Sequence, residues 1–146
     1  MAIRQKKAFT CDIFRKNKHK QNLLKNIKNY GLSDSIVLYD SDFLKIFAKD
    51  KLPMPVGVYF YDNGHEEENH YLAIKKVEPF LSKEALVIID DWGSSDTTDL
   101  YVKRVTEKAI AESGNTWKLL YDLPARFNGD KKMWWNGVAV FSFQRI

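Results

Sequence analysis

Two apolar, β-rich runs of this chain end abruptly in acidic residues. Run 56–61 reads VGVYFY and is followed by Asp62, and run 85–89 reads ALVII and is followed by Asp90 and Asp91. In an open α/β sheet, ligands bind just beyond the carboxyl ends of parallel strands. If the two runs are neighbouring parallel strands, the three carboxylates meet at one crevice, with His65 beside them. Such a group could hold a divalent metal and a general base.

The order of the remaining elements predicts an α/β protein with a mostly parallel sheet. We expect helices on both faces of the sheet, a closing antiparallel hairpin, and one domain over residues 1–146. Run 56–61 is apolar throughout, as in a strand that is covered on both faces. Gly31 is placed to end the first helix. Strands are expected at 7–14, 35–39, 56–61, 86–89, 117–123 and 138–143, and helices at 22–30, 43–47, 66–80 and 97–113.

Composition limits the class of protein. Hydrophobic residues make up 45% and charged residues 29% of the 146 residues, which favours a globular fold over disorder. The sequence holds no apolar run of the roughly 18 residues that span a bilayer, and its basic start leads into no signal-like stretch. The single cysteine, Cys11, cannot form an internal disulfide. We therefore expect a cytoplasmic protein without a membrane partner.

The net charge of +4 is unevenly distributed, because basic residues gather near the start. A nucleic-acid-binding module could use them as its electrostatic footprint. We favour a solvated helix face, since no recognition motif accompanies these residues. The basic residues are Arg4, Lys6, Lys7, Arg15, Lys16, Lys18 and Lys20.

Three short motifs carry a family resemblance: YFYDNGH at 59–65, IIDDW at 88–92 and WWNGV at 134–138. In this order and spacing the chain resembles the later part of class I S-adenosylmethionine-dependent methyltransferases. It is most similar to the group that includes macrocin-type O-methyltransferases. The resemblance runs from about Ala8 to the C-terminus, and it implies a Rossmann-like fold.

The resemblance also implies roles for particular residues. Asp12 matches the acid that bonds the ribose hydroxyls of S-adenosylmethionine, and Asp42 matches the acid that faces the adenine. Asp62 is expected to serve the cofactor and the reaction, with His65 as the base that takes the acceptor's proton. In metal-dependent members the ends of these strands hold Mg²⁺, which corresponds here to Asp62, Asp90 and Asp91. The reaction implied is O-methylation of a small-molecule or sugar hydroxyl, with the metal lowering the pKa of that hydroxyl.

The chain departs from the family at its start. The family's first strand and its glycine-rich turn have no counterpart, since Gly31, Gly57 and Gly64 lie elsewhere. Loss of that central strand would remove half of the cofactor pocket and expose two strand edges. We therefore expect a truncated methyltransferase-like domain, either inactive in isolation or completed by another chain or by self-association.

Each candidate also has a structural interpretation. Asp62 and Asp91 could cap a helix or turn, and His65 could be a turn residue. The aromatic side chains Trp92, Trp134 and Trp135 could shape a substrate mouth or pack in the core. Three functions therefore stay open: a metal-assisted O-methyltransferase, a non-catalytic remnant that acts as an oligomerising subunit, and a nucleic-acid-binding module.

Overall fold

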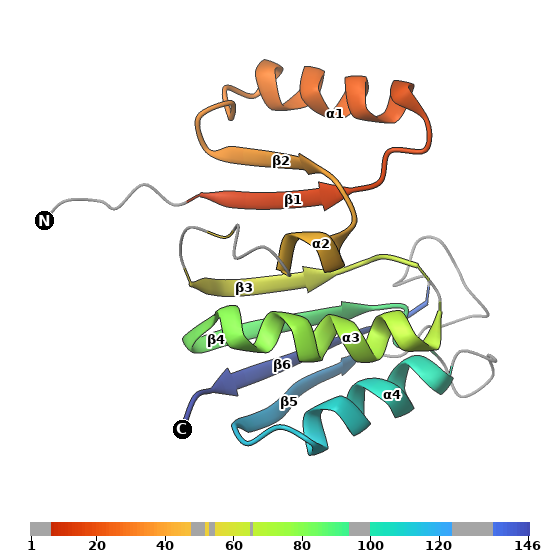
Figure 1. Cartoon of the computed structure of the whole chain (residues 1–146), viewed down its shortest axis with the longest axis vertical. Helices are drawn as coiled ribbons and strands as arrows, with labels where there is room; N and C mark the ends of the chain where they lie inside the picture. Colours follow the sequence, from red (N-terminus) through yellow and green to blue (C-terminus); the bar gives the residue numbers. More distant parts are fainter. Residues whose placement is uncertain (1–6, 48–51, 53–54, 65, 94–99, 124–135) are drawn as a thin grey trace, which may run out of the picture. The chain divides into compact units, whose positions relative to one another are not determined.

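Two compact units, Met1–Lys51 and Leu52–Ile146, divide the chain. The structure is a computed structural model, and it describes residues 7–47, 52, 55–64, 66–93, 100–123 and 136–146. Figure 1 shows the elements of both units. No helix among the described residues is long and apolar enough to cross a membrane.

The first unit is a β-α-β arrangement followed by a short helix. Strand β1 (Ala8–Asp12) and strand β2 (Ile36–Asp40) run parallel, with Ala8 opposite Ile36 and Asp12 opposite Asp40. Helix α1 (Asn17–Asn29) makes the crossover that parallel strands need. It begins before the helix expected at 22–30, because its first turns carry no apolar residue that periodicity could detect. Helix α2 (Phe43–Phe47) lies where a short helix was expected.

Gly31 ends helix α1 as the sequence predicts. Its φ of 66° is left-handed, a conformation that glycine adopts without steric cost. Two backbone bonds close the helix, from Gly31 N–H to the Lys28 carbonyl and from Leu32 N–H to the Ile27 carbonyl. This pair of bonds is the Schellman motif, which satisfies carbonyl groups that a helix end leaves open.

The second unit is built on a four-stranded sheet in the order β3-β4-β6-β5. The first two strands pair in parallel, and the last strand of the chain pairs antiparallel with both of its neighbours. The expected antiparallel closing pair is therefore present, and its second strand lies in the middle of the sheet. The elements are β3 (Val56–Tyr61), α3 (Glu67–Val77), a 3-10 turn (Glu78–Phe80), β4 (Leu81–Asp90), α4 (Leu100–Ala111), β5 (Thr116–Leu123) and β6 (Val138–Gln144).

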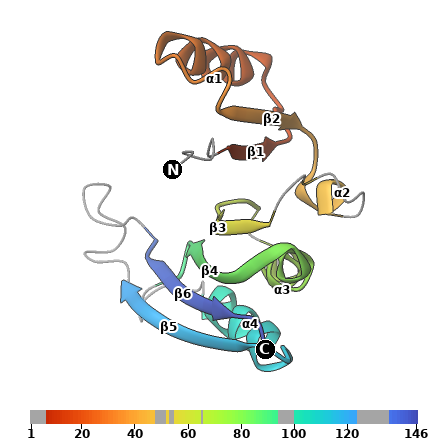
Figure 2. The same cartoon turned by 90° about the vertical axis from the view of Figure 1, so that its left-hand side faces the viewer.

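Both helices of this unit cover the same face of its sheet (Figure 2). Ile74 and Val77 of α3 are fully buried. On the sheet, Val87 and Ile89 of β4 and Phe141 of β6 meet these helices, because alternate strand residues point to one face. Further buried residues of this core are Ala73, Val102, Val105, Ala109, Ala139 and Phe143.

The expectation that run 56–61 is covered on both faces is wrong for the structure. Tyr61 is buried, whereas Val58 and Phe60 are exposed to 61% and 55%. Strand β3 is an edge of its sheet, and both described helices of this unit lie on the other face (Figure 2). An apolar run cannot reveal this, since its composition is the same whether one face or two are covered.

Arg145 fastens the end of the chain to the start of β4. Its guanidinium donates to the backbone carbonyls of Glu78, Pro79 and Leu81, at 3.0, 3.2 and 2.7 Å. Its backbone N–H donates to the carbonyl of Lys83. Because these bonds span the turn between α3 and β4, they fix the amino end of β4 to the end of β6.

Candidate functional site

The carboxyl ends of β3 and β4 meet at one edge of the second unit's sheet. The two strands are parallel, and their register places Tyr61 opposite Ile89. Asp62 therefore follows one strand where Asp90 ends the other, as the sequence predicts. The Asp62 side chain is exposed and that of Asp90 is half-buried. His65, the proposed base, lies outside the described residues.

Asp91 has the most constrained backbone at this edge. Its φ is 55°, and it is the only described non-glycine residue with a positive φ. Short acidic side chains tolerate this conformation better than most residues do. The Asp91 carboxylate is buried and accepts a 2.8 Å hydrogen bond from the side-chain amide of Asn136. Unusual backbone conformations of this kind gather at functional sites, so the geometry here is consistent with a site.

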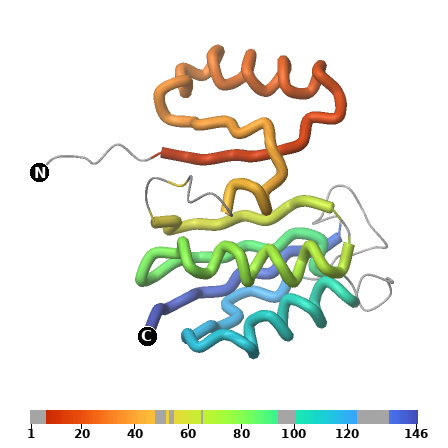
Figure 3. Tube along the Cα trace, viewed as in Figure 1, coloured from red at the N-terminus to blue at the C-terminus, as the bar shows by residue number. Residues whose placement is uncertain are grey.

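The turn after β4 is tied to the start of β6 by its backbone. Trp92 N–H donates to the carbonyl of Gly137, and Gly93 N–H donates to that of Asn136. Gly93 and Gly137 both have positive φ, 85° and 83°, which permits this close exchange. The path of the chain through this edge can be followed in Figure 3. Two segments distant in sequence thus hold the Asp91 carboxylate in place.

Trp92 packs in the core and does not shape a substrate mouth. It is 2% exposed, and its ring meets that of Phe141 edge-on with centroids 5.5 Å apart. The indole N–H donates to Asp122 at 3.0 Å, and Lys103 bonds the other Asp122 oxygen at 3.2 Å. The Lys103 ammonium also lies 5.7 Å from the centre of the indole. Trp134 and Trp135 lie outside the described residues, so their role stays a prediction.

Two of the three residues expected to contact the cofactor, Asp12 and Asp42, lie close together in the first unit. Asp12 ends β1 with an exposed side chain. Asp42 accepts a bond from Leu44 N–H at 2.9 Å, so its carboxylate caps the start of α2. Burial, followed by the charges of Asp12 and Asp42, raises the pKa of the Cys11 thiol. Both carboxylates therefore act on one thiol at the carboxyl end of β1.

These residues fit the adenosyl group only in part. The exposed Asp12 carboxylate can accept two hydroxyl donors, which is what a ribose offers. The Asp42 carboxylate already holds a helix end. Gly31 is the only glycine before residue 52, and it caps α1. The described part of the first unit therefore has no glycine-rich turn to approach a cofactor.

The predicted magnesium ligands do not form a metal-binding group. Among the described residues, no three His, Cys, Asp or Glu side chains gather closely enough to hold a metal ion. The Asp91 carboxylate is buried and bonded to Asn136, whereas the Asp62 side chain is exposed. The set Asp62, Asp90 and Asp91 therefore does not form a site that fits Mg²⁺ in this structure.

Sequence reasoning did not identify Asn136, Asp122 or Lys103 as residues that shape this edge. Asn136 belongs to the WWNGV motif, where an amide directly before a glycine and a strand was a usable signal. Asp122 and Lys103 gave no such signal, because their contacts with Trp92 join residues of β5 and α4 that are distant in sequence.

No protein-family model matches this chain, and no curated protein matches it either. Solved structures do match its fold. An O-methyltransferase from Bacillus cereus in complex with SAH superposes with a TM-score of 0.67 and 16% identity, over 95% of this chain and 63% of that one. Cofactor-bound Rv0187 from MTB gives 0.69 and 19%, over 98% and 63%. An rRNA methylase from Streptococcus thermophilus gives 0.61 and 12%, over 96% and 74%.

These similarities establish the class of fold. The chain has the mixed α/β, Rossmann-like architecture of its methyltransferase neighbours, with antiparallel strands at its C-terminal end. It spans less than two thirds of the length of the first two proteins. At identities this low the resemblance is one of fold, and activity is a separate question.

Proposed function

We propose that this chain serves transfer of a methyl group from S-adenosylmethionine to a hydroxyl oxygen of a small molecule or sugar. One observation carries the proposal. The parallel strands β3 and β4 end together in acidic residues, within a fold shared over 95% of the chain with an O-methyltransferase solved in complex with SAH. Ligands of open α/β sheets bind at this edge.

The bound cofactor would supply an electrophilic methyl group; the acceptor oxygen bonds its carbon while the C–S electron pair returns to sulfur. His65 takes the proton that the hydroxyl loses, because a neutral imidazole is a suitable base near pH 7. Asp62 accepts a hydrogen bond at the same edge and orients the reactants. Asp12 accepts hydrogen bonds from the ribose hydroxyls. Magnesium, expected from the family resemblance, has no part in these steps.

Calorimetric titration of the purified chain with S-adenosylhomocysteine tests binding. We expect micromolar affinity that Asp12→Ala weakens, and that Asp34→Ala, an exposed acid in the turn before β2, leaves unchanged. Titrations with added Mg²⁺ and with a chelator should give the same affinity, since Asp62, Asp90 and Asp91 do not gather into a metal site. Absence of binding by a chain that is folded by circular dichroism would contradict the proposal and favour the non-catalytic remnant.

The proposed base has its own test. His65→Gln should remove methyl transfer to a hydroxyl acceptor while S-adenosylhomocysteine still binds, because the imidazole acts on the acceptor and not on the cofactor. Asn63→Ala serves as the matched control, since its side-chain oxygen bonds only the neighbouring Gly64 N–H among the interactions seen. Equal rates for His65→Gln and the unaltered chain would assign the proton to another group.

The composition of helix α1 supports nucleic acid as a second candidate partner. Its sequence, NKHKQNLLKNIKN, contains no acidic residue, and most of its side chains are exposed. Lys20 is neutralised by Asp40 at 2.7 Å, which leaves a lysine- and amide-rich surface that suits phosphates. Polarisation of a labelled RNA should show binding that falls steeply with salt and weakens in Lys25→Glu. A flat salt response would remove this candidate.

A further inference from the structure

The second face of the four-stranded sheet is apolar and open. It carries one side chain of each strand at the same level: Phe60, Ile88, Val140 and Tyr121 lie in one row of the register. The next row contributes Val58 and Leu86. The exposed fractions of Val58, Phe60, Leu86 and Tyr121 are 61%, 55%, 39% and 60%. We call this surface the open face, and its residues are Val58, Phe60, Leu86, Ile88, Val140 and Tyr121.

A surface of this kind requires a cover. Parallel strand pairs are usually covered on both faces, and contiguous apolar patches on soluble proteins mark interaction sites. Helices α3 and α4 occupy the other face (Figure 2). The described residues of this unit include no element that covers the open face. The cover therefore has to come from outside these residues.

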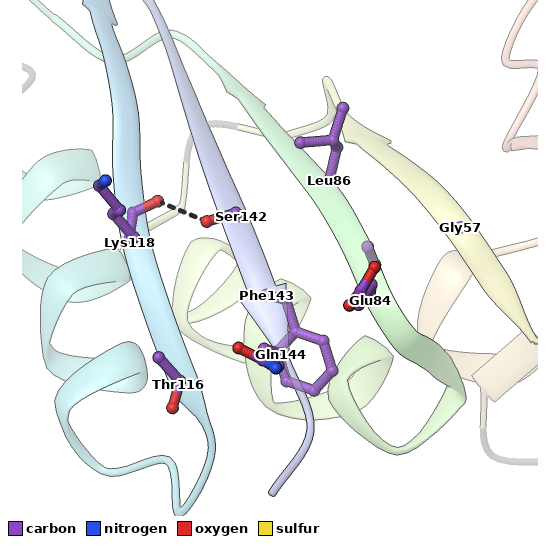
Figure 4. A pocket seen from close by; sticks show the side chains of 9 residues that line it. Gly57, Glu84, Leu86, Thr116, Lys118, Ser142, Phe143 and Gln144 are labelled. Atoms are coloured by element: carbon purple, nitrogen blue, oxygen red, sulfur yellow. Dashed lines mark hydrogen bonds between the residues drawn. The ribbon is translucent and has the colours of Figure 1, made fainter.

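A negatively charged and a positively charged side chain border the open face at the amino end of β4. Glu84 and Lys118 line an open hollow of about 490 Å³ there, together with Thr116, Ser142 and Gln144 (Figure 4). In the register Glu84 lies opposite Gln144, and Lys118 lies opposite Ser142, so strand β6 separates the two charges. An acid and a base at the same end of one apolar face make that face complementary to itself.

We propose that the open face is the contact surface for a second copy of this chain. A two-fold axis along the strands would lay β4 over β6 of the second copy, and β3 over its β5. Val58 and Phe60 would then meet Tyr121 of the other copy, and Glu84 would approach its Lys118. Two-fold contacts are reciprocal, so each favourable pair occurs twice. Two sheet faces pack in this way at about 10 Å, with strands about 30° apart.

Self-complementarity selects this occupant over an unrelated polypeptide. A covering helix from a different protein would need an apolar stripe but no acid and base at this spacing. The second copy supplies both from the residues already described. The dimer proposal does not rest on methyl transfer, since none of the open-face residues belongs to the acidic edge, which is formed by Asp62, Asp90 and Asp91.

Sedimentation velocity of the full chain over a concentration series tests the proposal. We expect a monomer–dimer equilibrium that Phe60→Glu weakens by about 100-fold or more, because the interface would bury an unpaired charge. Tyr30→Glu is the control, since Tyr30 is a 77% exposed apolar residue of the first unit. It should leave the equilibrium unchanged. Circular dichroism confirms that each variant is folded.

A charge exchange adds a test that folding cannot imitate. Glu84→Lys and Lys118→Glu should each weaken the dimer, because each brings like charges together. The double variant should restore it, since the pair is reformed with its signs reversed. A chain that stays monomeric at about 100 µM, where even a weak interface would be populated, or a dimer that survives Phe60→Glu, would overturn the proposal. A monomer that binds a hydrophobic dye would also overturn it and assign the face to a different polypeptide.

Discussion

Substitution of Asn136 by alanine should destabilise the second unit. The amide of Asn136 donates to the Asp91 carboxylate at 2.8 Å, and Asp91 is only 8% exposed. Water therefore cannot readily replace the lost donor. A hydrogen bond to a charged group contributes about 1.5–3 kcal/mol, so we expect a loss of that size in the free energy of unfolding. The backbone bonds at residues 92 and 93 do not involve this side chain and should persist.

Urea unfolding followed by tryptophan fluorescence measures this loss. All 4 tryptophans lie in the second unit, so the signal reports on that unit. With a slope of about 2 kcal/mol per molar urea, the midpoint should fall by roughly 1 M. Asn63→Ala is the control, because its side chain is exposed and bonds only locally. Surface changes of that kind usually stay within about 0.5 kcal/mol.

A double-mutant cycle connects the effect to Asp91. Asp91→Gly removes the carboxylate and accepts the φ of 55° without strain. In that background Asn136→Ala should cost about 1 kcal/mol or less, since its partner is gone. If Asn136→Ala leaves the midpoint within error in the unaltered chain, or if the two losses simply add, the Asn136 amide does not hold Asp91.

Three further predictions concern other parts of the chain. Gly31→Ala should lower stability by about 1 kcal/mol, because φ is 66° although space is open; thermal melting followed by circular dichroism measures it. Arg145→Ala should cost about 2 kcal/mol in urea unfolding, since three backbone carbonyls lose a charged donor, and Lys83→Ala is its exposed control. The Cys11 thiol should react slowly with iodoacetamide near pH 8 and faster in Asp12→Asn, because burial and the nearby carboxylates raise its pKa. That raised pKa stabilises the fold below about pH 8.5, and the contribution should be lost as pH rises further.

Element types and their order follow from short-range signals in the sequence. The runs before Asp12, Asp62 and Asp90 are β-rich and end in acid, and each forms a strand that ends at that acid or directly before it. Glu67 and Glu68 indicate the start of helix α3, because acidic residues suit the positive amino end of the helix dipole. The expected boundaries of these elements agree less well with the structure than their types do. Strand β4 starts at Leu81, before the expected 86–89, because polar residues at 82–84 interrupt its apolar pattern.

The arrangement at the site depends on long-range contacts that a single sequence does not display. The left-handed backbone of Asp91 is fixed by residues 136 and 137, which join it only when β6 enters the sheet beside β4. The magnesium prediction relied on the positions of three acids at the ends of two strands, which do not show whether their side chains gather. Trp92 has the same explanation, since its partners come from β5, β6 and α4.

The open face and the acidic edge place different demands on the same sheet. Strand β3 contributes Asp62 at its carboxyl end, but its Val58 and Phe60 are exposed on an edge strand. Few buried apolar contacts make a segment open more readily, so cover over this face should help to hold strand β3 and the Asp62 that follows it. Dimer formation would therefore steady the edge that we propose for methyl transfer. Phe60→Glu should then weaken S-adenosylhomocysteine binding as well as the dimer, although Phe60 itself has no proposed part in methyl transfer. Unchanged binding by the Phe60→Glu monomer would show that the acidic edge is organised without the second copy.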